Sequence, residues 1–105
     1  SYPPHQPDES LLRSMEKDAE ALLRIKFEGK YQPFLQSIRD RQFGQALRRA
    51  CSAGEVALFI LLADYANKGA IILDLNEFTL LTKKTSLDYA IESGNQELVA
   101  VLSTN

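Results

Sequence analysis

The chain repeats its own pattern at an offset of 40 residues, and each copy places a glycine between two apolar stripes. The coinciding positions are Leu47 with Leu87, Ala50 with Ala90, Gly54 with Gly94, Leu58 with Leu98 and Leu62 with Leu102. Helical periodicity alone predicts recurring leucines, but it does not predict a glycine between two stripes of different phase. The repeat therefore predicts two helix–turn–helix hairpins with corners at Gly54 and Gly94.

The better copy, residues 83–102, resembles the ankyrin repeat, whose core reads roughly T-P-L-H-x-A-x-x-G-x-x-E/D-x-V-x-x-L-L. The resemblance rests on Thr85, Leu87, Ala90, Gly94, Glu97, Val99 and Leu102. A second, degenerate copy covers about 43–62. Ser86 replaces the usual proline and Asp88 the usual histidine, so the hydrogen bonds around that turn must differ from the common pattern.

This resemblance implies an all-α fold, a short ankyrin-like stack of antiparallel helix pairs. Thr85 would start the first helix of its unit, and Ala90 must be small because neighbouring helices pack closely there. Between the two copies, residues 69–84 are longer than usual and rich in Ile, Leu, Phe and Thr. They suggest an extended finger or short hairpin, although a short helix at 75–81 is an alternative.

The N-terminal part predicts two more helices, over 10–28 and 33–43. Asp8 or Ser10 can cap the first helix, and Gly29 can end it. Its expected buried stripe consists of Leu11, Leu12, Met15, Ala19, Leu22, Leu23 and Lys26. The second helix begins at Pro33, places Gln42 at the end of its stripe and is broken by Gly44.

These elements predict one helical domain over residues 10–105, after a proline-rich, flexible lead-in at 1–9. Within it, residues 10–43 would form an N-terminal cap or a divergent extra repeat, and residues 44–105 the two ankyrin-like units. Two units alone bury too little surface to be stable, so the N-terminal helices are expected to stack on the first unit.

Composition narrows the class of protein. The chain has 105 residues, 45% of them hydrophobic and 25% charged, which is typical of a globular domain. Its net charge of −2 argues against a nucleic-acid partner. One cysteine excludes an internal disulfide, and no apolar run is long enough for a membrane span. We therefore expect an intracellular, cytoplasmic location.

Candidate catalytic residues are few. The single histidine, His5, lies in the proline-rich end, and Cys51 occupies a position that takes a small apolar residue, so both are expected to be structural or solvated. A reactive thiol beside Arg48 is the alternative for Cys51. The glycines are scattered, and no Cys/His set has metal-ligand spacing. The sequence therefore predicts no enzyme activity, no cofactor and no metal site.

A basic cluster is the strongest polar feature, and it consists of Arg39, Arg41, Arg48 and Arg49. One interpretation is a solvated helix face whose arginines pair with Asp40 or with glutamates of the first helix. The other is a patch for an acidic partner, because arginine binds carboxylates and phosphates in a bidentate manner.

The resemblance implies a non-catalytic module that binds another protein through the fingers and the exposed side of each first helix. Carried over by position, the contact residues are Lys83, Lys84, Ser86, Tyr89 and Asn95 in the better copy and Arg49 and Ser52 in the weaker one. Tyr89 is the sharpest candidate anchor, unless it packs against the neighbouring repeat.

Two other functions fit the same residues. The domain could be the accessory targeting part of a larger multidomain enzyme or of a bacterial effector that acts inside a host cell. It could also be a helical oligomerisation module with the first helix as its seam. We expect a monomer or a weak dimer.

Overall fold

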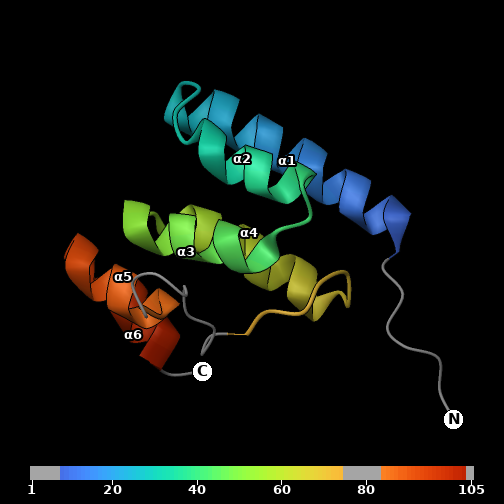
Figure 1. Ribbon diagram of the computed structural model, residues 1–105. Helices are drawn as coiled ribbons and strands as arrows, with labels where there is room; N and C mark the ends of the chain where they lie inside the picture. The colour runs from blue at the N-terminus through green and yellow to red at the C-terminus, as the bar shows by residue number, and fades with distance from the viewer. Residues whose placement is uncertain (1–7, 75–83, 104–105) are drawn as a thin grey trace, which may run out of the picture.

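A computed structural model describes residues 8–74 and 84–103, and the regular elements in these two segments are six α-helices (Figure 1). Their bounds are α1 Glu9–Phe27, α2 Gln32–Arg39, α3 Phe43–Ala53, α4 Val56–Asn67, α5 Ser86–Ser93 and α6 Gln96–Ser103. The predicted all-α class is confirmed. The finger or hairpin expected within 69–84 falls largely outside the described residues, as do His5 and most of the N-terminal lead-in.

The two aligned glycines form the corners of helical hairpins, as predicted. Gly54 ends α3 with φ of 71°, and Gly94 ends α5 with φ of 74°. Glycine adopts this left-handed conformation at little steric cost, so each helix can stop and the chain can turn back within two residues. The repeated glycine therefore predicted correctly that both helix pairs turn at a left-handed glycine.

Two side chains cap the start of α5. The Asp88 backbone N–H donates to the Thr85 hydroxyl at 3.3 Å, and the Thr85 backbone N–H donates to the Asp88 carboxylate at 2.9 Å. This reciprocal capping box satisfies two backbone donors at the helix start. Thr85 thus has its predicted role of starting the helix. Asp88, which stands where the common pattern has a histidine, accepts the hydrogen bond from the Thr85 backbone N–H.

The helices pack in two layers. In one layer, α3 lies between α2 and α5; we call α2, α3 and α5 the α3 layer (Figure 1). Behind it in that view, α1 packs on α4, and α6 packs on α5; we call α1, α4 and α6 the α4 layer. Ala50 and Ala90 are fully buried and small, which allows α3 and α5 to approach closely.

The α1–α2 pair enters these layers in the opposite order from the other two pairs. Its first helix lies in the α4 layer and its second in the α3 layer, whereas α3 and α5 are the first helices of their hairpins. A third copy of the same unit would place its first helix beside α3. The first pair therefore packs on α3 and α4 in the reverse order, and its role as a cap stays a prediction.

Leucines from all three pairs form the shared core. The fully buried leucines are Leu12, Leu23, Leu47, Leu58, Leu62 and Leu98. Met15 and Ala19 complete the predicted stripe of α1, while Leu11 and Leu22 are half-buried beside it. The prediction that Lys26 belongs to this buried stripe is wrong, because Lys26 is exposed beyond its end.

The position predicted for the end of the second helix is also wrong. Instead of running to residue 43, α2 ends at Arg39, and Arg41 adopts a left-handed φ of 59°. The Gln42 backbone N–H then donates to the Ser37 carbonyl at 2.8 Å, which closes the turn and leaves the Gln42 side chain exposed. Because α3 already begins at Phe43, Gly44 lies in its first turn and breaks nothing.

Candidate functional site

Three residues predicted from two different repeat copies meet at one hollow in the α3 layer. Arg49 and Ser52 reach it from α3, and Tyr89 reaches it from α5. The hollow has a volume of about 240 Å³, and Gln45 and Arg48 complete its lining. It therefore combines two guanidinium groups, an amide, a hydroxyl and a phenol, a set of groups that bind a carboxylate or another polar anion.

A second hollow adjoins Arg49 and Ser52 on the side of α2. Its volume is about 250 Å³, and its other lining residues are Tyr31, Pro33, Phe34 and Ala53. The Tyr31 hydroxyl donates to the Glu55 carboxylate at 3.0 Å, and burial is the main cause that raises its pKa. Arg49 and Ser52 thus lie between a polar hollow toward α5 and a more apolar one toward α2.

Gln45 and Arg48 were missed as site residues, although a signal was available. Residues 45, 48, 49 and 52 follow the three-and-four spacing of one helix face, so the assignment of Arg49 and Ser52 already implied them. The Ser37 hydroxyl on α2 donates to the Gln45 side chain at 3.1 Å. This bond holds Gln45 at the edge of the hollow.

The four arginines of the basic cluster lie in two different environments. Arg39 lies 2.6 Å from Glu20, and Arg41 lies 3.0 Å from Glu9, so both pair with glutamates of α1, as one interpretation predicted. These exposed pairs help to orient α2 on α1 but add little stability each. The other two arginines, Arg48 and Arg49, line the hollow.

The prediction that Ser86 belongs to the contact surface is wrong. Its side chain is 1% exposed and forms a hydrogen bond with Cys51 across the interface of α3 and α5. Position in the family pattern suggested a surface residue, but the capping box begins α5 at Ser86 and turns its side chain into the core. Ser86 therefore joins α5 to α3 and is not part of the surface.

Asn95 is likewise occupied between the two hairpins. Its amide donates to the Gly54 carbonyl, and its carbonyl oxygen accepts from the Leu98 backbone N–H at 2.9 Å. These bonds tie the second corner to the first and cap the start of α6. Asn95 therefore has a structural role that the sequence did not predict.

The remaining predicted contacts lie at the start of α5. Lys84 forms an ion pair with Glu92, and its ammonium lies 5.8 Å from the centre of the Tyr89 ring. Tyr89 is half-buried and packs partly on the core, while it also lines the hollow. Its packing is thus confirmed, and its contact with a partner stays a prediction. Lys83 lies outside the described residues.

Cys51 has the environment of a core residue. It is fully buried, and this burial raises the pKa of its thiol from 9.0 to about 12, a change that the Ser86 hydrogen bond opposes only in part. A thiol with such a pKa carries almost no thiolate at neutral pH. The structure thus supports the apolar interpretation of Cys51 over the reactive one.

Residues 8–74 and 84–103 contain neither a candidate metal cluster nor a helix suited to a membrane. No three His, Cys, Asp or Glu side chains gather there in a metal-binding arrangement. None of the helices in this part of the chain has the length and apolar character needed to cross a membrane. Comparison of the chain with protein-family models, with curated proteins and with solved structures found no match.

Proposed function

We propose that this chain is a non-catalytic protein-interaction domain of the ankyrin-repeat type, and that it binds another protein through the α3 layer. The observation that carries the proposal is the convergence of Arg49, Ser52 and Tyr89 on one hollow. The family pattern assigned these residues to binding in two separate copies. Their spatial convergence is what a shared contact surface requires.

The size and chemistry of the hollow support a protein partner over a small substrate. A volume of about 240 Å³ accommodates one side chain and is below the usual range of small-molecule pockets. Two arginines on one helix face favour an aspartate, glutamate or phosphorylated side chain. We infer that the partner places one acidic side chain beside Arg49 and packs an apolar group against Tyr89.

The helical framework supports the ankyrin-type part of the proposal. Both hairpins turn at a left-handed glycine, both bury an alanine at the equivalent position, and the better one begins with a threonine cap. In such scaffolds the framework is kept while the surface varies. We place the domain inside the cell, where a reducing environment suits its single, buried free thiol.

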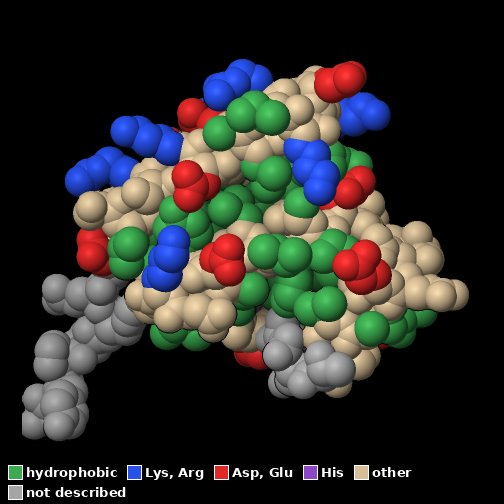
Figure 2. Space-filling view, turned by 180° about the vertical axis from the view of Figure 1, so that it is seen from behind, with side chains coloured by type: hydrophobic (Ala, Val, Ile, Leu, Met, Phe, Trp, Pro, Cys, Tyr) green, Lys and Arg blue, Asp and Glu red, His purple; other side chains and the backbone are tan. Residues whose placement is uncertain are grey.

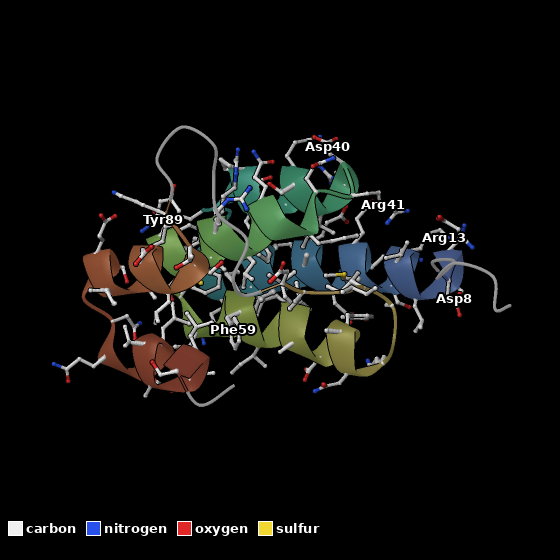
Figure 3. The ribbon with its side chains drawn as sticks, turned by 60° about the horizontal axis from the view of Figure 1, so that its bottom comes forward. Asp8, Arg13, Asp40, Arg41, Phe59 and Tyr89 are labelled. Atoms are coloured by element: carbon white, nitrogen blue, oxygen red, sulfur yellow. The ribbon has the colours of Figure 1, made fainter. Side chains whose placement is uncertain are left out.

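The test is affinity capture from native lysate with matched variants. The Arg49→Glu/Tyr89→Ala double variant is expected to bind the captured partner at least about 30-fold more weakly, the loss typical of a central contact. Arg13→Glu makes the same charge change on α1 and should bind as the wild type does. Figure 3 shows Arg13 and Tyr89 at opposite ends of the molecule. Equal binding by the double variant would exclude this surface.

A further inference from the structure

The opposite face of the molecule carries an apolar groove that the proposed partner surface does not include. It runs between α1 and α4 and has a volume of about 500 Å³. Its lining residues are Asp18, Ala21, Leu22, Ile25, Lys26, Ala57, Ile60, Leu61 and Asp64. Figure 2 shows hydrophobic side chains gathered across the middle of this face, with acidic and basic side chains around them.

Two isoleucines at the groove are exposed to an extent that the fold itself does not require. Ile25 is 75% exposed and Ile60 is 48% exposed, and both lie beside the half-buried Leu22 and Leu61. A continuous apolar patch rimmed by charges is typical of a surface that another protein covers. The composition of the groove thus indicates an interface with another protein surface.

The charges at the rim are ordered along the groove. The Tyr65 hydroxyl near the end of α4 donates to Asp18 on α1, and Glu55 at the start of α4 lines one hollow with Lys26 near the end of α1. The two helices are therefore antiparallel, with Asp18 and Asp64 at one end of the groove. Lys26 lies two helical turns further along α1, about 12 Å from Asp18 at 1.5 Å per residue. Among the lining residues, the two carboxylates therefore lie at one end, the apolar side chains in the middle and the Lys26 ammonium at the other end.

We propose that this groove binds a second copy of the same chain. A two-fold axis that lies in the interface and crosses the groove reverses its direction, so each Lys26 meets Asp18 and Asp64 of the other copy. Ile60 lies midway along the groove and then packs against its counterpart near the centre, while each Ile25 packs on the apolar lining of the other copy nearer the Lys26 end. A parallel alignment would place acid on acid, so the charges select the antiparallel one.

The antiparallel alignment favours a second copy over an unrelated partner because the groove is complementary to itself. It would join α1 and α4 of both copies into a four-helix arrangement, with the seam on the first helix. The α3 layer of each copy stays uncovered on the outside, so the dimer would present two partner surfaces and gain from bivalent binding. The dimer itself does not depend on the proposed function.

Sedimentation equilibrium of the full chain tests the proposal over roughly 5–500 µM, a range in which weak dimers dissociate. The wild type is expected to follow a monomer–dimer equilibrium. Lys26→Glu and Asp64→Lys should each weaken the dimer at least about tenfold, since each creates like-charge contacts twice across the axis. Both residues lie at the rim, so the variants should keep the helical circular dichroism of the wild type.

Mixing the two charge variants is the decisive step. Lys26→Glu in one chain faces Asp64→Lys in the other, so the mixture should form heterodimers where neither variant dimerises alone. Ile91→Lys is the matched control, because Ile91 is 56% exposed but lies on α5, away from the groove. A strict monomer at the highest concentration would overturn the proposal. Failure of the mixture to dimerise, or loss of the dimer in Ile91→Lys, would overturn it equally.

Discussion

Gly54 and Gly94 occupy the same corner of two equivalent hairpins but have different surroundings. A Cβ added to Gly54 would lie 3.1 Å from the Ser93 hydroxyl oxygen, whereas a Cβ on Gly94 would meet nothing within 4 Å. Both glycines are left-handed, so alanine strains the backbone at either position. Only at Gly54 does the missing side chain also allow close packing of two hairpins.

This difference yields a residue-scale prediction. Gly94→Ala should lower the free energy of unfolding by about 1 kcal/mol through backbone strain. Gly54→Ala should lower it by roughly a further 1 kcal/mol, because it also crowds Ser93. Urea denaturation of the two variants measures the difference directly. Equal losses would mean that Gly54 does not pack closely against Ser93 of α5.

A second residue-scale prediction concerns Cys51. At pH 8, a thiol with a pKa of about 12 has about 1000-fold less thiolate than one with its ordinary value of 9.0. An aromatic disulfide reagent should therefore react with the native protein at least about 1000-fold more slowly than with the urea-unfolded chain. Similar rates in the two states would contradict a buried, protonated thiol.

The same shift in pKa fixes the sign of its effect on stability. The thiol is neutral in both states below pH 9, so its contribution to stability is fully present there. Above pH 9 the unfolded thiol loses its proton while the native one keeps it. This contribution is therefore lost as the pH rises from about 9 to 12.

Residue roles were predictable only where local chemistry decides them. Thr85 and the two glycines were predicted correctly, because a cap or a left-handed corner depends on a few neighbouring residues. Ser86 and Asn95 were assigned to the surface by their position in a family pattern. Their side chains instead form hydrogen bonds with Cys51 and Gly54, 35 and 41 residues away in the sequence, which periodicity does not show.

At the scale of elements, a hydrogen bond from Tyr65 joins α4 to α1. Its side chain is buried, its hydroxyl donates to Asp18, and burial together with this carboxylate raises the pKa of Tyr65 to about 12. The phenol is therefore protonated at neutral pH and able to donate. No other tyrosine–carboxylate bond in the described segments joins these two helices.

Removal of this bond should loosen the cap measurably. Tyr65→Phe is expected to lower the free energy of unfolding by about 1 kcal/mol, the usual net contribution of one hydrogen bond. A double-mutant cycle with Asp18→Ala, followed by urea denaturation, isolates the pairwise term. Additive losses in the double variant would show that Tyr65 and Asp18 do not interact.

Helix existence was predictable from the sequence, but helix ends and layer order were not. The apolar stripes predicted α1 and both hairpins. The early end of α2 depends on the left-handed conformation of Arg41. An arginine does not indicate this conformation in a sequence, whereas a glycine would. The reversed entry of the first pair depends on which helices α1 and α2 contact, and that is a tertiary property.

At the scale of the whole molecule, the two layers have different chemistry. The α3 layer is hollowed around Arg49 and Ser52, and the α4 layer carries the apolar groove between α1 and α4. One face thus suits an acidic side chain of a partner, and the other suits a second copy. Separate faces would allow both interactions at once, which is the basis for expecting bivalent binding.

The most direct test of the partner surface is site-specific photo-crosslinking. A photoreactive phenylalanine analogue replaces Ser52, which is exposed beside the hollow, or Arg13, which is exposed on α1. After capture from lysate and illumination, the Ser52 position is predicted to form a covalent adduct with the partner, and the Arg13 position is not. An adduct from Arg13 without one from Ser52 would contradict binding through the α3 layer.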